Sequence, residues 1–530
     1  MPEFDEVPPP AEPPETAMET DGRESGPDDV RMPRHPGRVR RAAIVGLRVV
    51  AGTVGIVAAV AVVGAVGLVP LPSHHHTSPA VTVTPEPADQ VRVCPGALLR
   101  LGDVSGQNAS VPSSLGAPSV RADGIGSTLR RAPFAESDAR TGGGSSAPQE
   151  LTIAPATGAT LSGAQSQLVS TPDFTGLAAA SCAEPSGSIW LVGGSTAVGR
   201  TTLLTVANPS AVDATVAVTI LDPTGSVSAP GMSGIVVKAG AQRVIPLAGF
   251  APDVVSPVVH VVSRGGRVVA ALQQSIVRGL DPGGVDLVGG GADPATRVVI
   301  PGIRVLNAVG VNKALALPDW DDVTSVVRLA VPGDRAAKVQ VSLVPEDSTF
   351  NGLSFQTDVA AGQVNELGLD SAADTDSGKV SIPDGTYSVV ITSDQPVVAG
   401  VRVSTAVDAP GDVGVASDSS APSSDFAWYA SAPELTDDTA VSVAAGPSPI
   451  LSAVNPGKTA ITLHLVQGVT DVTLAVPAGG SASISVAPGS YLLRGGRGLV
   501  AAISYAGSAE LASYPITSAR PVSGPIVIHP

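Results

Sequence analysis

The sequence has few aromatic residues, an excess of negative charge, and none of the common catalytic motifs. Aromatic side chains make up 3% of 530 residues, so the exposed rings on which sugar-binding surfaces usually depend are scarce. A net charge of −16 argues against nucleic acid or anionic lipid surfaces as partners. The G-x-S-x-G elbow of serine hydrolases and the H-E-x-x-H pair of zinc proteases are both missing. We therefore expect no catalytic activity and no cofactor.

One long uncharged stretch, Val49–Leu71, separates a short N-terminal tail from the bulk of the chain. At a rise of about 1.5 Å per residue, a helix of this length covers a bilayer core of roughly 30 Å. The stretch predicts a transmembrane helix over residues 42–71. The alternative is a cleaved signal peptide, but the apolar part of such peptides is normally only about 7 to 15 residues long. The length favours a retained anchor.

Positive charge on one flank predicts the orientation of this helix. Residues 72–90 contain no Lys or Arg, whereas arginines are frequent before the stretch. The six nearest to it are Arg31, Arg34, Arg38, Arg40, Arg41 and Arg48. Because positive flanks stay on the cytoplasmic side, we expect a cytoplasmic N-terminus and an extracytoplasmic C-terminal bulk. The acidic, proline-rich residues 1–41 are predicted to be a disordered tail, and residues 72–92 a Pro/Thr stalk.

The composition of the C-terminal bulk favours β-strands. Val and Thr are abundant, and 59 Gly and 48 Pro supply turns and interrupt helices. Three stretches repeat one order of features, namely a strand, a Pro/Gly turn, a second strand, a Gly turn and a hairpin. We predict an all-β fold of tandem immunoglobulin-like β-sandwich modules at 188–288, 296–408 and 426–519. A β-propeller is the rival, but its blades are only about 40 to 50 residues long.

The remaining segments have weaker patterns. Residues 93–187 are rich in Gly and Ser and are predicted to form an irregular N-terminal cap of the extracytoplasmic part. Residues 409–425 are expected to be a polar linker, and residues 520–530 a C-terminal tail.

The two cysteines, Cys94 and Cys182, both lie on the predicted extracytoplasmic side, where disulfides persist. A bridge between them would staple the N-terminal cap to the start of the first module. The alternative is a pair of buried free thiols. An even pair in an oxidising compartment favours the bridge.

Three groups of residues carry a weak chemical signal. Gly194–Thr201 nearly matches the phosphate-binding loop, but Arg200 replaces the required Lys and a β-rich run follows, so we expect no nucleotide binding. His74–His76 lie on the predicted stalk, without a fold to converge them on a metal. Acidic loops around Asp286 and Asp322 could hold calcium, but no calcium-loop motif is present, so solvated turns are the simpler interpretation.

Phe426, Trp428 and Tyr429 form the one aromatic cluster of the C-terminal bulk. Their alternation fits the first strand of the third module, with the rings buried rather than displayed. A glycan contact at these three residues is the alternative interpretation.

Several short motifs carry a resemblance to a known family. They are Val93-Cys94-Pro95-Gly96 after the stalk, Trp190–Ser195 after the second cysteine, Gly199-Arg200 leading to Asn208-Pro209, and Arg267–Ala271. Together with the anchor, they make the chain resemble the actinobacterial domain-of-unknown-function 5719 family of membrane-anchored secreted proteins. The resemblance implies an envelope protein without an assigned activity, so no catalytic residue is carried over.

These observations predict a single-pass, membrane-anchored protein of the bacterial cell envelope with a structural or protein-interaction role. Its expected partners are the membrane, through one helix, and other envelope proteins or cell-wall glycan. The rival prediction is an extracytoplasmic part that binds or processes cell-wall glycan.

Overall fold

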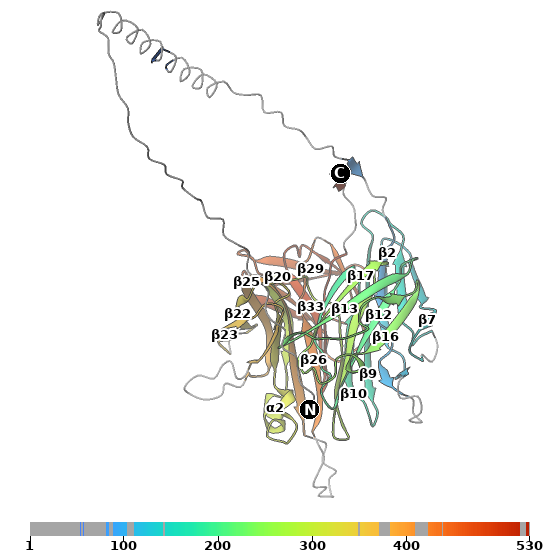
Figure 1. Ribbon diagram of the computed structural model, residues 1–530, viewed down its shortest axis with the longest axis vertical. Helices are drawn as coiled ribbons and strands as arrows, with labels where there is room; N and C mark the ends of the chain where they lie inside the picture. Colours follow the sequence, from blue (N-terminus) through green and yellow to red (C-terminus); the bar gives the residue numbers. More distant parts are fainter. Residues whose placement is uncertain are drawn as a thin grey trace, which may run out of the picture. The chain divides into compact units, whose positions relative to one another are not determined.

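The computed structural model describes residues 53–54, 57, 81–83, 88–102, 111–140, 144–347, 350–369, 382–408, 422–436, 438–519 and 526–528. These residues are mostly β-strand, as expected (Figure 1). Helical structure includes α2 (Ala308–Ala314) and the short 3-10 turns η1 (Leu247–Gly249) and η2 (Asp321–Val323). No helix within this described part is long and apolar enough to cross a membrane. The anchor predicted at 42–71 lies almost entirely outside the described residues.

The N-terminal segment contains ordered strands, which corrects the expectation of an irregular cap. One sheet has the order β2-β8-β6 and a second the order β10-β9-β5, and we call them the N-terminal sheet pair. Residues from both sheets share a small core that includes Cys94, Leu151, Leu161 and Cys182. The strands of this segment are β2 (Gln90–Cys94), β3 (Leu99–Leu101), β4 (Pro112–Ser114), β5 (Ser119–Ile125), β6 (Leu129–Pro133), β7 (Glu136–Ser137), β8 (Gln149–Ile153), β9 (Thr160–Ser170) and β10 (Thr175–Ser181). Of these, β3 and β4 pair with each other, and β7 joins a sheet of the first sheet pair described next. A short strand, β1 (Val81–Val83), precedes them.

Two further sheets form the first sheet pair. Their strand orders are β11-β17-β13-β14, with β15 beside β13, and β19-β18-β12-β16-β7. Valine and leucine side chains alternate along these strands and fill a core between the sheets. The strands are β11 (Ser188–Val192), β12 (Arg200–Asn208), β13 (Ala214–Asp222), β14 (Gly225–Ser226), β15 (Ile235–Val237), β16 (Ala241–Pro246), β17 (Val258–Gly265), β18 (Val269–Arg278) and β19 (Asp281–Val288).

The second sheet pair is organised by one long strand, β25 (Gly385–Val407). Its first half pairs with β20 and β22, and its second half pairs with β21 and β26. Side chains from both halves share one core. The other strands are β20 (Ala295–Val305), β21 (Val326–Ala330), β22 (Ala337–Pro345), β23 (Leu353–Val359), β24 (Val364–Gly368) and β26 (Ser423–Ala430).

Strand β26 corrects two expectations. It begins at Ser423, inside the segment predicted to be a linker, and it carries the aromatic cluster. It pairs with β25 of the second sheet pair over its whole length, so it does not open the third module. The alternation of side chains along the sequence correctly indicated a strand at these residues. The strand with which it pairs is determined by tertiary contacts, which leave no local sequence pattern.

The third sheet pair has the strand orders β27-β32-β29-β30 and β31-β28-β33-β34. Its core also receives Ala164, Leu177 and Ala179 from the N-terminal sheet pair. The strands are β27 (Thr439–Val443), β28 (Ile450–Val454), β29 (Ile461–Gln467), β30 (Thr470–Val476), β31 (Ser481–Ser485), β32 (Gly489–Arg494), β33 (Val500–Ala506) and β34 (Leu511–Pro515). A short strand, β35 (Ile526–Ile528), follows them.

The first and third sheet pairs repeat one turn in detail. Asn208 and Asn455 each lie at the end of a strand, before a proline, and are fully buried. Each side-chain amide donates to two backbone carbonyls, and each side-chain oxygen accepts the N–H two residues later. The internal repeat seen in the sequence therefore has a common hydrogen-bonding basis.

The sheet pairs pack on one another in a closed cycle rather than as a string of separate modules. Apolar clusters join the N-terminal pair to the first, the first to the second, the second to the third, and the third back to the N-terminal pair. Four edge strands, one from each pair, contact one another inside this cycle, namely β10, β19, β26 and β34. We call their meeting point the central junction.

Candidate functional site

A fully buried carboxylate, that of Asp425, lies at the central junction. It belongs to β26, and its side-chain oxygens accept backbone N–H groups from three other strands. Leu177 of β10 donates at 2.9 Å, Leu511 of β34 at 3.1 Å and Val285 of β19 at 3.2 Å. The outer edge of a sheet presents unpaired N–H groups, which are costly to bury without acceptors. Asp425 therefore supplies acceptors to the edges of three sheet pairs from within the fourth.

Two glycines at this junction leave room for the carboxylate of Asp425. Gly284 of β19 has φ +118°, and a Cβ there would lie 2.8 Å from Oδ1 of Asp425. Gly176 of β10 has φ +131°, and its Cβ would lie 2.5 Å from the same oxygen. Only glycine meets both requirements at these two positions.

Burial raises the pKa of Asp425 well above its usual range, and the backbone N–H groups that it accepts oppose this rise. The same two opposing effects act on the pKa of Asp286 of β19. Burial raises this pKa well above its usual range, and the N–H groups of Trp428 and Leu287 lower it. Its Oδ2 accepts the Trp428 N–H at 2.7 Å. Asp286 therefore joins the first and second sheet pairs by a second carboxylate-to-backbone contact.

The aromatic cluster faces the interior, as expected. Phe426, Trp428 and Tyr429 each expose 1% of their surface. The Trp428 indole donates to Gln274 at 2.7 Å, and the Tyr429 hydroxyl accepts the N–H of Arg304 at 3.1 Å. The three rings therefore present no exposed face at the surface of the described part.

Arginine and acidic side chains join the first sheet pair to the second, and we call this the charged junction. Asp322 lies between two arginines of the first pair, with Oδ1 2.7 Å from Arg278 and Oδ2 2.7 Å from Arg200. Burial would raise the pKa of Asp322, but the positive charges of Arg278 and Arg200 outweigh it and hold that pKa below its usual value. Arg200, which occupies the lysine position of the near phosphate-binding loop, is thus held in an internal ion pair.

Arg328 forms the second half of the charged junction. Its side chain is fully buried, its Nε lies 2.6 Å from Glu366, and its guanidinium lies 4.4 Å from the centre of the Trp428 ring. Its Nη1 donates to the carbonyls of Gly194 and Pro257 in the first sheet pair, at 2.9 and 2.8 Å. Burial would raise the pKa of Glu366, but Arg328 lowers it below its usual value. The guanidinium thus has acceptors on both sides of the junction.

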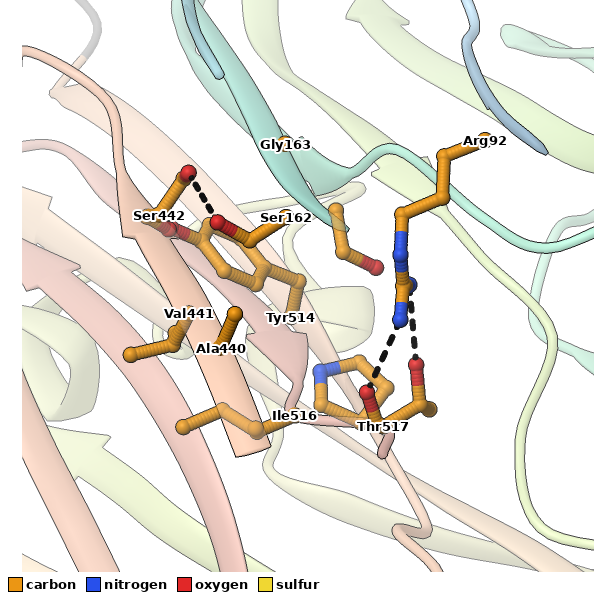
Figure 2. Close-up of a pocket in the computed structure, with 11 residues that line it drawn as sticks. Arg92, Ser162, Gly163, Ala440, Val441, Ser442, Tyr514, Ile516 and Thr517 are labelled. Atoms are coloured by element: carbon orange, nitrogen blue, oxygen red, sulfur yellow. Dashed lines mark hydrogen bonds between the residues drawn. The ribbon is translucent and has the colours of Figure 1, made fainter. Parts of the chain in front are cut away.

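The N-terminal and third sheet pairs meet through small polar side chains, and we call this the serine junction. Figure 2 shows Ser162 directed at Ser442, with their hydroxyl oxygens 2.8 Å apart. Ser166 donates to the carbonyl of Ala445 nearby. Between the two sheet pairs lies a cavity of about 20 Å³, which has room for about one water molecule.

Arg92 borders this cavity and points toward Thr517, as Figure 2 shows. Its guanidinium donates to the Thr517 carbonyl at 3.2 Å and, on the other side, to Leu161 at 2.8 Å and Cys182 at 3.3 Å. Burial lowers the pKa of Arg92, while the charge of Glu184 raises it. The first strand of the N-terminal pair is thereby bonded to the chain that leaves the third.

Cys94 and Cys182 form the predicted disulfide, which is completely buried. The other candidates of the sequence are separated from one another. Asp286 is buried at the central junction and Asp322 is ion-paired, so neither belongs to a solvated calcium loop. Among the described residues, no three His, Cys, Asp or Glu side chains are placed to hold a metal ion. His74–His76 lie outside the described residues.

A family model supports the resemblance seen in the sequence. The model described as "Family of unknown function (DUF5719)" matches residues 135–488, which is more than half of the chain. The chain belongs to this family. Searches of curated proteins and of solved structures gave no match.

The range matched by the DUF5719 model contains some of the junction residues and leaves others outside. It contains the residues of the charged junction and Asp425 itself. Arg92 and Thr517, which are bonded to each other at the serine junction, lie outside it, as does Cys94 of the disulfide. The family description assigns no activity to any of these residues.

Few features of the sequence predict the junction residues. Asp425 directly precedes the apolar run Phe426–Ala430, and Arg328 is a single charge in the apolar run Val326–Ala330. A charge inside a buried strand indicates a buried partner. That signal could have identified both residues, although not their partners.

Proposed function

We propose that this protein is a non-enzymatic structural component of the bacterial cell envelope, held in the membrane by one N-terminal helix. Its extracytoplasmic part would be a rigid body built from immunoglobulin-like sandwich modules near 188–288 and 296–408, with a third ending near 519. This body would present its outer surfaces to other envelope components.

The observation that carries the proposal is the carboxylate of Asp425, which accepts backbone N–H groups from three sheet pairs while belonging to the fourth. Flexible tandem modules would not share a buried acceptor, because free movement would expose and break such contacts. The arrangement therefore supports a body that keeps its shape under load.

A second observation concerns the side chains that the sequence offered for chemistry. Arg200, Asp322 and Asp286 make contacts within the protein, and the aromatic cluster is buried. Phe4 lies outside the described residues, and every described aromatic side chain is buried or half-buried. These features favour a packing role over a glycan platform.

Rigidity can be tested by hydrogen exchange on the full chain in detergent across a urea series. We expect the strands of all four sheet pairs to lose protection at the same urea concentration, because the central junction couples them. Four separate transitions would overturn the rigid-body proposal.

Location and role require a second experiment. Protease added to intact spheroplasts should digest the part after residue 72 and spare an epitope on the N-terminal tail. The same full chain should show no saturable binding to cell-wall polysaccharide fractions. Protection of the C-terminal part would contradict the orientation, and saturable binding would contradict the purely structural role.

A further inference from the structure

Strand β30 leaves a long edge of the third sheet pair without a neighbour among the described residues. It is the outermost strand of the sheet β27-β32-β29-β30 and pairs with β29 along Thr470–Val476. Several other edge strands, such as β7, β14 and β15, are only two or three residues long. Short edges are a common protection against pairing with another chain. Strand β30, which is 7 residues long, lacks this protection.

The side chains of β30 also lack the usual protection. The strand contains no Lys and no Pro, which commonly interrupt edge pairing. Its one charged residue, Asp471, is already engaged, since its carboxylate lies 3.1 Å from Nδ1 of His464 on β29. The backbone edge is therefore open to a strand from another molecule.

One face of β30 is incompletely covered. Val472 and Leu474 stand opposite Leu465 and Leu463 of β29, both of which are buried in the core. Leu474 exposes 8% of its surface, but Val472 on the same face exposes 41%. The core therefore ends at the outer side of β30 with an apolar side chain that nothing in the described residues covers.

We propose that β30 pairs in antiparallel fashion with β30 of a second copy of this chain, about a two-fold axis at Thr473. In this register Val472 stands opposite Leu474 of the second copy, so each exposed valine is covered by a leucine. Asp471 stands opposite Ala475, so no like charges meet. The two four-stranded sheets become one continuous sheet, and the interface is the same patch on both copies.

This register is consistent with the alternation of hydrogen bonds in antiparallel sheets. Val472 and Leu474 are two residues apart, so their backbone groups point to the same side of β30. In this register, the N–H and C=O groups of two facing residues either both point into the interface or both point away from it. The register is therefore compatible with antiparallel hydrogen bonding in either case. The inference depends on β30 alone and is independent of the proposed structural role.

The test is cysteine cross-linking of the full chain in detergent. Because the axis passes between the two Thr473 residues, a Thr473→Cys variant brings two thiols within about 5 Å of each other. We expect disulfide-linked dimer at least tenfold above that of a Thr219→Cys variant. Thr219 is also an exposed threonine, but it lies on β13, which pairs with β17 on one side and with β14 and β15 on the other. Equal cross-linking of the two variants would overturn the proposal.

A blocking substitution separates specific pairing from chance collision. Val472→Lys in the Thr473→Cys background should reduce cross-linking at least tenfold, whereas Val212→Lys, at an exposed loop valine, should not change it. Hydrogen-exchange protection of β29 reports whether the third sheet pair stays folded in each variant. Undiminished cross-linking in the folded Val472→Lys variant would also overturn the proposal.

Discussion

The charged junction and the serine junction close the same cycle of sheet pairs with different chemistry. At the charged junction, three arginine–carboxylate contacts lie between sheets, namely Arg278–Asp322, Arg200–Asp322 and Arg328–Glu366. Trp320 lies against Arg278, and Trp428 lies against Arg328. At the serine junction, hydroxyl groups bond across a close approach of backbones, and one arginine donates only to neutral oxygens.

The difference concerns what happens when one partner is removed. A buried ion pair is stable only while both charges are present, since each alone is strongly disfavoured in a low-dielectric interior. A hydroxyl pair costs less to break, because a neutral group is left. We therefore expect the charged junction to be more sensitive than the serine junction to the loss of one partner. The disulfide lies in the N-terminal sheet pair, so we expect its removal to affect the serine junction before the charged one.

Removal of the disulfide should have the largest effect. The bridge joins residues 88 apart in sequence, so a Cys94→Ala/Cys182→Ala variant should lose about 4 to 5 kcal/mol of unfolding free energy in the chain-entropy model. Urea denaturation measures the loss. Hydrogen exchange should show that the N-terminal sheet pair and the serine junction lose protection first. A loss spread evenly over both junctions would contradict the distinction between them.

Asp425→Ala should have the next largest effect, about 3 to 4 kcal/mol, because it leaves three buried N–H groups without their acceptor. Urea denaturation of the full chain measures it. The matched control is Asp358→Ala, at an exposed position on β23, which should change stability by less than about 0.5 kcal/mol. Equal effects of the two variants would show that Asp425 does not hold the sheet pairs together.

Arg328→Met should cost about 2 to 3 kcal/mol, because Glu366 keeps its charge in a largely buried site. The double variant Arg328→Met/Glu366→Met should return to within about 1 kcal/mol of the unsubstituted protein. A thermal or urea series measures all three proteins. Failure of the second substitution to restore stability would mean that the arginine contributes chiefly through its bonds to Gly194 and Pro257.

The dependence of stability on pH should distinguish the charged junction from the serine junction further. The pKa of Glu366 is lowered in the folded protein, so its stabilisation is complete above the ordinary value of 4.5 and is lost as the pH falls below it. The raised pKa values of Asp286 and Asp425 act in the opposite direction, favouring the folded state at low pH. The urea midpoint of Arg328→Met/Glu366→Met should therefore fall less on acidification than that of the unsubstituted protein. An identical acid response would contradict the lowered pKa.

Ser442→Ala should have the smallest effect, about 1 kcal/mol. Its hydroxyl contacts Ser162 at 2.8 Å and Ser490 at 3.1 Å, and both remain neutral after the change. Ser226→Ala, at an exposed position in β14, is the control. A loss as large as that of Arg328→Met would erase the proposed difference between the junctions.

Features with a local pattern could be predicted from the sequence, and contacts between distant segments could not. Val/Thr alternation and Gly turns predicted the all-β class, and the single cysteine pair predicted the bridge. Asp425 accepts an N–H from Leu177, which is 248 residues away, and no spacing in the chain indicates that contact. The strands of the N-terminal segment were missed because its Gly and Ser residues pack closely against other sheets, where small side chains replace the usual apolar pattern.

The bond between Arg92 and Thr517 has a mechanical consequence. It holds together the two points at which the chain enters β2 and leaves β34, although 425 residues separate them. Tension applied between these two points would be carried by this contact and its neighbours. Such a force would not pass through the central junction.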